Sequence, residues 1–366
     1  MEERVVPQRL LELMRERGFH DDEIYAAAAD GSLHFLAIDQ LLGSSKLRYT
    51  AVEIADKVDL ELSIVRRLWR ALGFRDFRDD EAIFTEVDLD AAYSLKAIIS
   101  EGNISTSSAL QLARVMGSSM ARFAEAEIVA SSAFKDISDD EVSSDPIALA
   151  DRFTRYSSST VPTIPQLLVY TWLRHLHAAS TRALIAIDSG AKDVGLRTLA
   201  VGFLDLVGFT VISQQLSIDE LSHVVGKFEE VSSEVVSRHN GRVVKMIGDE
   251  VMFVVESPVE ACSIALELAE YYSRDSQISN VRGGLSYGEV LVQDGDYYGS
   301  VVNTASRIVN IAAPGTTLAT RIVGDMALES GLFTAKALKP RELKDIGVVD
   351  LSVIRRVPLN PSDSQK

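Results

Sequence analysis

The stretch from Leu199 to Thr210 constrains the fold of this 366-residue chain more than any other feature. It is an apolar run, typical of a buried strand, that is interrupted by one carboxylate, Asp205. A carboxylate in such a strand is costly unless a cation or hydrogen bonds satisfy it. The pattern therefore indicates metal binding near the end of a strand. The alternative is that Asp205 only caps the turn after its strand.

The segment from Gly241 to Val255 contains two β-branched runs joined at Gly248-Asp249, which predicts a tight hairpin. Side chains of a strand alternate between its faces, so Lys245 and Ile247 share a face that leads to Asp249. Two aspartates on neighbouring strands can hold a pair of divalent ions that activate a hydroxyl group and neutralise phosphate oxygens. Taken alone, Asp249 could also be an ordinary turn residue.

A third motif runs from Asp294 to Arg307, where a turn-rich loop leads into a predicted helix. Asn303 and Arg307 are four residues apart and therefore share one face of that helix. An arginine with a neighbouring amide suits a phosphoryl centre whose charge grows in the transition state.

Together these motifs resemble the catalytic domain of class III adenylate cyclases. The matching pattern is Phe-x-Asp-x-x-Gly-Phe-Thr at 203 to 210, Lys-x-x-Gly-Asp at 245 to 249, and an aspartate seven residues before Asn-x-x-x-Arg at 303 to 307. The motifs agree in order and spacing, and the resemblance covers residues 199 to 357. Such agreement is far more specific than one isolated motif.

The resemblance implies roles for individual residues. Asp205 and Asp249 would bind two Mg²⁺ or Mn²⁺ ions per site, and Lys245 with Asp296 would read the adenine edge of ATP. A lysine donor and an aspartate acceptor suit the ring nitrogen and exocyclic amine of adenine, whereas guanylate cyclases of this class place other residues there. Asn303 would orient the ribose.

The resemblance also implies that Arg307 stabilises the transition state at the α-phosphate, and that Phe209 and Thr210 of the first motif contact the substrate. Lys344 lies about where the family has a triphosphate-binding lysine, although its neighbours depart from the usual glycine-flanked pattern. The implied reaction converts ATP to 3′,5′-cyclic AMP and pyrophosphate.

The family forms each active site between two cyclase domains, with the metal aspartates on one and the base-reading and transition-state residues on the other. This chain has one such domain and the complete set of residues. We therefore expect a homodimer with two equivalent sites and a two-fold interface.

Periodicity within the domain predicts helices from Ile218 to His239 and from Pro258 onward, and strands near Val281 to Leu291. The order β-α-β-β-α-β predicts a ferredoxin-like α+β core. Two alternatives remain open. The hairpin also resembles that of diguanylate cyclases, which lack the element from Asn303 to Arg307, and an inactive nucleotide-binding cyclase domain would be a signalling module.

Residues 1 to 187 are predicted to be all-helical, with a break at residues 43 to 45. Mycobacterial-type cyclases, which this arrangement weakly resembles, use a helical amino-terminal domain to restrain catalysis. The longest predicted helix, residues 166 to 187, carries a stripe of Leu168, Trp172, Leu176 and Ala179 that needs a partner. A linker at residues 188 to 198 and a tail at residues 358 to 366 flank the catalytic domain.

Residues 49 to 99 resemble the helix-turn-helix of MerR-type regulators, beginning with a capping box at Thr50 and Glu53. The segment departs from them at Val58-Asp59, where a glycine is usual. Three interpretations compete: a DNA-binding module, a helix-turn-helix fold reused for regulation or dimerisation, and a plain three-helix bundle with paired arginines. The arginines concerned are Arg66, Arg67, Arg70, Arg75 and Arg78, and their expected partners are Asp76, Asp79 and Asp80.

Composition limits the remaining classes. The net charge of −16 makes nucleic-acid binding an unfavourable interpretation, because phosphate neutralisation needs clustered lysine and arginine. The single Cys262 excludes an intramolecular disulfide, and its apolar neighbours predict a packed thiol. We see no signal peptide and no apolar stretch of the length that spans a bilayer, so we expect no membrane span and a cytoplasmic location.

Overall fold

The computed structural model describes residues 6–16, 18–39, 49–101, 104–131, 146–188, 190, 193, 195–275 and 280–358. The chain divides into two compact units, Met1–Arg182 and Ala183–Lys366. The predicted break at 43 to 45, parts of the predicted linker and most of the predicted tail lie outside the described residues. Of the helices described, none is both long and apolar enough to cross a membrane.

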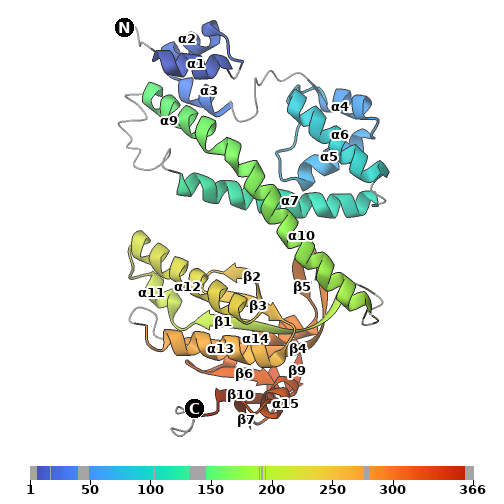
Figure 1. Ribbon diagram of the computed structural model, residues 1–366, viewed down its shortest axis with the longest axis vertical. Coiled ribbons are helices and arrows are strands. Elements are labelled where there is room, and N and C mark those ends of the chain that lie inside the picture. The colour runs from blue at the N-terminus through green and yellow to red at the C-terminus, as the bar shows by residue number, and fades with distance from the viewer. Residues whose placement is uncertain are drawn as a thin grey trace. The chain divides into compact units, whose positions relative to one another are not determined.

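The first unit is helical throughout its described part (Figure 1). One hydrophobic cluster joins the first three helices to α9, and a second is built from α4 to α6 and the segment between α5 and α6. Its helices are α1 Gln8–Glu16, α2 Asp21–Asp30, α3 Leu33–Asp39, α4 Ala51–Val58, α5 Leu62–Ala71, α6 Glu86–Glu101, α7 Thr106–Ala130, α9 Pro146–Ser159, the 3-10 helix η2 Val161–Thr163 and most of α10 Ile164–Asp188, whose last turns belong to the second unit.

The segment that resembles a helix-turn-helix is formed by α4, α5 and α6. Helix α4 begins at the predicted capping box, in which Thr50 Oγ1 accepts the backbone N–H of Glu53 and Glu53 accepts the backbone N–H of Thr50. Helix α4 ends at Val58, and the next residue, Asp59, has a left-handed φ of 51°, so aspartate takes the conformation that glycine usually takes in this turn.

Four of the five arginines in this segment pair with carboxylates. Three pairs involve the aspartates expected for a plain bundle, and the fourth partner is a glutamate. The pairs are Arg66–Asp79, Arg70–Asp76, Arg78–Asp80 and Arg75–Glu81. These ion pairs favour the bundle and regulatory interpretations over DNA binding, because the guanidinium groups already have counter-ions.

Helix α10 contains the predicted helix of residues 166 to 187 and has no buried residue. On the predicted stripe, the side chains of Trp172 and Leu176 are 60% and 45% exposed. The expectation that this stripe needs a partner therefore stays a prediction.

The second unit is built on a sheet whose order is β2-β3-β1-β4-β6-β10-β7, with β5 also paired to β4 (Figure 1). The strands of this sheet are β1 Leu196–Leu206, β2 Arg242–Ile247, β3 Glu250–Val255, β4 Val281–Gln293, β5 Asp296–Tyr298, β6 Thr317–Thr320, β7 Phe333–Ala337 and β10 Leu351–Arg356. A separate two-stranded sheet consists of β8 Arg341–Leu343 and β9 Gly347–Val349. The helices that follow in this unit are α11 Phe209–Ser213, α12 Ile218–Arg238, α13 Pro258–Tyr272, α14 Ser300–Ile311 and α15 Arg321–Glu329.

The predicted order β-α-β-β-α-β is confirmed by β1, α12, β2, β3, α13 and β4. Both predicted helix starts are capped, because Ser217 accepts the N–H of Glu220 and Ser257 accepts that of Glu260. The prediction began β1 three residues late and did not include β6, β7 and β10, which extend the sheet beyond β4. Cys262 is fully buried, as predicted.

Alternate residues of β1 pack into separate hydrophobic clusters, one on each face of the sheet. Ala200 and Leu204 pack with α12 and α13, whereas Val201 and Phe203 pack with α14. Asp205 continues the second series, so the face covered by α14 is the face that carries it.

Candidate active site

Strand β1 and the β2–β3 turn bring the two predicted metal ligands together. Asp205 is the penultimate residue of β1, and its side chain is 14% exposed. Asp249 lies in the turn, which begins at Gly248 in the left-handed region, and its carbonyl accepts the N–H of Leu206 at 3.1 Å. Burial, and next the charge of Asp205, raise the pKa of the Asp249 carboxyl. The two carboxylates therefore interact through space.

Two residues that sequence analysis missed complete this group. In the antiparallel ladders Asp205 lies opposite Glu250 of β3 and opposite Arg282 of β4. Arg282 places Nε at 2.6 Å and Nη2 at 2.5 Å from Oδ2 of Asp205. Burial, followed by the charges of Asp205 and Asp249, raises the pKa of Glu250 to about 7. A signal for Arg282 was present, because it is a charged residue within an apolar strand pattern, as Asp205 is.

These residues fit a divalent cation. Two partly buried carboxylates that repel one another are relieved by a cation, and carboxylate oxygen is the ligand type that Mg²⁺ and Mn²⁺ prefer. Among the described residues, no group of three or more His, Cys, Asp or Glu side chains is arranged to hold a metal ion. Asp205 and Asp249 would therefore hold ions together with water and substrate phosphates, as is usual for Mg²⁺.

The two predicted base-reading residues meet within one chain. Lys245 of β2 forms an ion pair with Asp296, although the two residues are 51 positions apart. Asp296 does not lie in a loop, as its turn-rich sequence predicts, but begins β5, because the chain turns back at Asp294 and Gly295 to pair with β4. The other oxygen of Asp296 accepts the N–H of Tyr297 at 2.8 Å.

Helix α14 carries Asn303 and Arg307, and both are exposed. Arg307 Nη2 lies 3.9 Å from the carboxylate of Asp345, which follows Lys344 in the turn between β8 and β9. The structure therefore brings the turn that contains Lys344 close to Arg307, and the Lys344 side chain is itself exposed.

Helix α14 lies very close to β4 at Gly284. A Cβ atom at Gly284 would lie 2.5 Å from the carbonyl oxygen of Ala305 and 2.5 Å from the backbone nitrogen of Val309. Only glycine allows this approach, and it therefore sets how closely α14, which carries Asn303 and Arg307, packs against β4.

The predicted substrate contacts after β1 are partly described. Phe209 is the first residue of α11, after Gly208 with a φ of 76°, and it packs partly buried against the core on the α12 side. The side chain of Thr210 lies outside the described residues. The roles of Phe209 and Thr210 stay predictions.

Within one chain the site residues form separate groups. No hydrogen bond or ion pair recorded among the described residues joins Asp205 or Asp249 to Asn303 or Arg307.

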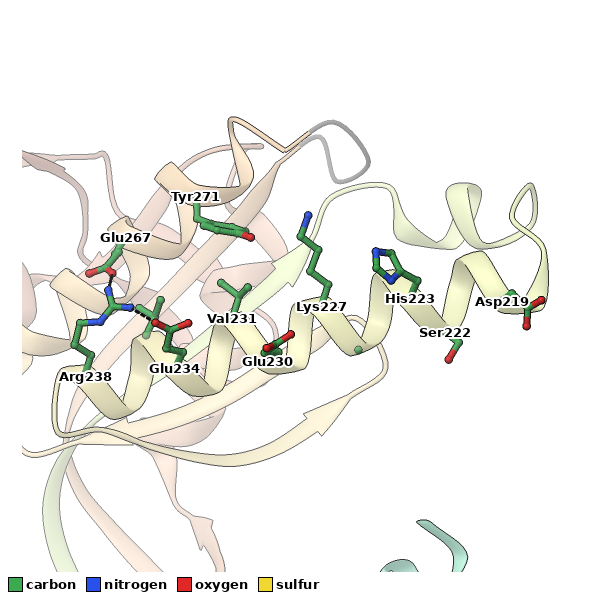
Figure 2. Close-up of a pocket in the computed structure, with 12 residues that line it drawn as sticks. Asp219, Ser222, His223, Lys227, Glu230, Val231, Glu234, Arg238, Glu267 and Tyr271 are labelled. Carbon is green, nitrogen blue, oxygen red and sulfur yellow. Dashed lines mark hydrogen bonds and ion pairs between the residues drawn. The ribbon is translucent and has the colours of Figure 1, made fainter. Parts of the chain in front are cut away.

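A surface cavity lies elsewhere, between α12 and α13 (Figure 2). It has a volume of about 890 Å³ and contains none of the predicted site residues. Figure 2 shows Lys227, Tyr271 and the paired Arg238 and Glu267 along it. These helices cover the face of the sheet opposite to α14, so the cavity is distinct from the candidate active site.

Comparison with known proteins decides the family. Residues 195–350 match the family model of the adenylate and guanylate cyclase catalytic domain, and residues 2–177 match that of the adenylate cyclase regulatory domain. An adenylate cyclase of Glutamicibacter nicotianae is 32% identical over 84% of this chain and 78% of its own length. The chain belongs to the class III adenylate cyclases.

Other similar proteins extend this comparison. An adenylate cyclase of Streptomyces coelicolor is 33% identical over 77% of this chain and 72% of its own. A pH-sensitive adenylate cyclase of Mycobacterium tuberculosis is 29% identical over 95% of this chain and 87% of its own. The solved structure of the adenylyl cyclase CyaB from P. aeruginosa covers 45% of this cyclase and 96% of its own chain, at 20% identity and a TM-score of 0.41.

Proposed function

We propose that this cyclase converts ATP to 3′,5′-cyclic AMP and pyrophosphate, through attack of the ribose 3′-hydroxyl on the α-phosphate. The observation that carries the proposal is the pairing of Lys245 with Asp296, 51 residues apart, on the face of the sheet that also carries Asp205. Lys245 would donate to the adenine ring nitrogen, and Asp296 would accept from the exocyclic amine. A buried polar group left unpaired by the wrong base typically costs about 1–3 kcal/mol.

Each remaining residue has a task that its position suits. Asp205 and Asp249 would hold two Mg²⁺ or Mn²⁺ ions, which would neutralise phosphate oxygens and favour ionisation of the attacking hydroxyl. Asn303 would orient the ribose, and the exposed Arg307 would donate to the α-phosphate oxygens as their charge grows. The turn with Lys344 would contact the outer phosphates.

The active enzyme would be a homodimer. Each active site of this family forms between two cyclase domains, and this chain matches the catalytic-domain model once, over residues 195–350. The group with Asp205 and Asp249 and the group with Asn303 and Arg307 would therefore come from different copies. A two-fold dimer would then contain two identical sites. We also place the enzyme in the cytoplasm, where ATP is available.

Product formation tests this function. The full-length chain is incubated with ATP or GTP and with Mg²⁺, Mn²⁺ or EDTA, and cyclic nucleotide and pyrophosphate are quantified. We expect cyclic AMP only with a divalent ion and a clear preference for ATP. Asp205→Asn and Asp249→Asn should lose at least about 100-fold in kcat, since each removes a charged ligand. Asp325→Asn, which alters an exposed aspartate of α15, is the matched control. Wild-type turnover in either site variant would refute the assignment.

We further propose that the helical unit restrains catalysis, which the match of residues 2–177 to a regulatory domain supports. Restraint needs only a bias of a few kcal/mol between two dimer arrangements. The test compares the full-length chain with residues 190 to 366 across pH 5.5 to 8. The shorter chain should be more active at one or more pH values, and equal or lower activity throughout would contradict restraint.

A further inference from the structure

Strand β2 contains a bulge that changes which side chains share a face. Arg242 lies opposite Val254, but Lys245 lies opposite Met252, so Val244 is an extra residue in β2. In a regular strand, residues three apart project from opposite faces. Val254 and Met252 lie in the same cluster on the α14 face. The bulge therefore directs both Arg242 and Lys245 to the face that carries the candidate site.

Both of these side chains contact β5. Lys245 pairs with Asp296, and the guanidinium carbon of Arg242 lies 5.2 Å from the ring centroid of Tyr297. Tyr297 is 6% exposed and packs in the cluster with strand residues of β1 and β3. Its N–H also donates to Asp296. Tyr297 thus connects Arg242 to the carboxylate that Lys245 binds.

We propose that Arg242 is a positioning residue for base selectivity: it holds Tyr297, and through it the β5 strand, so that Asp296 stays at the base-reading position beside Lys245. This inference rests on the proposed use of Lys245 and Asp296 to recognise adenine. Arg242 acts through Tyr297 and needs no contact with the nucleotide.

The physical reason is that the backbone pairing of β5 with β4 does not by itself fix the side chain of Asp296 beside Lys245. The Lys245 and Asp296 side chains are 38% and 28% exposed, and an ion pair of such exposure is weak and yields to solvent. Strand β5 has three residues and pairs with β4 alone, at the end of that strand, so its side-chain contacts with β2 add to a short ladder. A cation–π contact at the adjacent residue adds a second point of attachment and limits rotation about the first.

The test uses the full-length enzyme and four variants. Arg242→Ala removes the cation, Arg242→Lys keeps it, and Tyr297→Phe keeps the ring without the hydroxyl. Arg321→Ala, which removes an arginine 72% exposed on α15, is the matched control. The kcat and KM values are measured with ATP and GTP, and Kd values are measured by fluorescence with labelled ATP and GTP analogues.

For Arg242→Ala we expect the ATP-over-GTP ratio of kcat/KM to fall about two- to five-fold, the range for one cation–π contact at an exposed site. The loss should appear in KM and in the Kd of the ATP analogue, with kcat within two-fold of wild type. Arg242→Lys and Tyr297→Phe should recover most of the ratio. A general loss of structure would lower kcat for both nucleotides alike and leave the ratio unchanged.

An unchanged ratio in Arg242→Ala, alongside a clear wild-type preference for ATP, overturns this inference and leaves the proposed function intact. A wild-type ratio near one contradicts the proposed reading of adenine and this inference with it. If Arg242→Ala lowers the melting temperature, a double-mutant cycle is measured with Arg242→Ala, Tyr297→Leu and the variant that carries both changes. The quantity compared in the cycle is the ATP-over-GTP ratio of kcat/KM. Additive effects would then also overturn the coupling.

Discussion

Replacement of Arg282 by alanine is the perturbation whose effect on stability the structure defines best. Its guanidinium group contacts Oδ2 of Asp205 through Nε and Nη2 and donates from Nη1 to the carbonyl of Asn310 at 3.3 Å. Asp205 also faces the charges of Asp249 and Glu250. In Arg282→Ala the carboxylates would lose their one recorded protein cation and keep their mutual repulsion.

The magnitude follows from burial. Removing one partner of a fully buried pair costs about 3–5 kcal/mol. Asp205 and Arg282 are 14% and 29% exposed, so solvent screens part of this and about 2–3 kcal/mol is expected in the absence of metal. For a unit of this size, 1 kcal/mol shifts the melting temperature by about 2–4 °C. The expected loss is therefore about 4–12 °C.

The assay is thermal unfolding followed by fluorescence, in EDTA and in saturating Mn²⁺ or Mg²⁺. Arg282→Ala should be destabilised in EDTA, and the divalent ion should raise its melting temperature more than it raises that of wild type. The reason is that an ion that binds only the folded state stabilises it more when its affinity is higher, and in the variant the Arg282 guanidinium no longer competes with the ion for these carboxylates. Arg321→Ala should behave as wild type. An EDTA melting temperature of Arg282→Ala within about 1 °C of wild type would refute this electrostatic account.

Two further predictions concern the same face of the sheet. The pKa of Glu250 is raised from 4.5 to about 7, so the folded state binds the extra proton between these values and stability falls as pH rises through that window. At pH 8 Glu250→Gln should therefore increase the free energy of unfolding by up to about 3 kcal/mol and raise the melting temperature, whereas at pH 4.5 both should change little. Equal shifts of the melting temperature at both pH values would contradict this. Gly284→Ala should displace α14, lower kcat and destabilise the fold by about 1–3 kcal/mol or more, as unfolding and activity assays would show. Gly226→Ala, at an open position of α12, should be neutral or stabilising, and wild-type behaviour of Gly284→Ala would show that the helix does not need this approach.

Local patterns predicted much of the catalytic domain. The strand around Asp205, the hairpin at Gly248 and the helices that begin at Ile218 and Pro258 each depend on nearby residues, and each formed as predicted. The resemblance to class III adenylate cyclases also selected Lys245 and Asp296 as a functional pair. Their contact within one chain was not predictable from spacing, because it depends on how β5 returns to β4.

Features that depend on long-range pairing were missed for physical reasons. Arg282 and Glu250 belong to the metal-side group only because of the register of β1 with β3 and β4. The bulge at Val244 has no signature in an alternating pattern of β-branched residues, and a strict period of two places Arg242 on the wrong face. For the stripe on α10 the sequence predicts a packing partner, and since no residue of α10 is buried in the described part of the chain, that partner stays a prediction.

Sites shared between two copies are the central claim, and mixing inactive variants tests it most directly. Asp205→Ala and Arg307→Ala chains are each purified, then mixed under conditions that let subunits exchange, and cyclic AMP formation from ATP is measured. Random exchange makes half of the dimers heterodimers, each with one intact composite site, so about a quarter of wild-type activity should return. Asp205→Ala mixed with Asp249→Ala should stay inactive, because both changes lie on the same half-site. No recovery in the first mixture, with heterodimers shown to form, would contradict shared sites and place all catalytic residues within one chain.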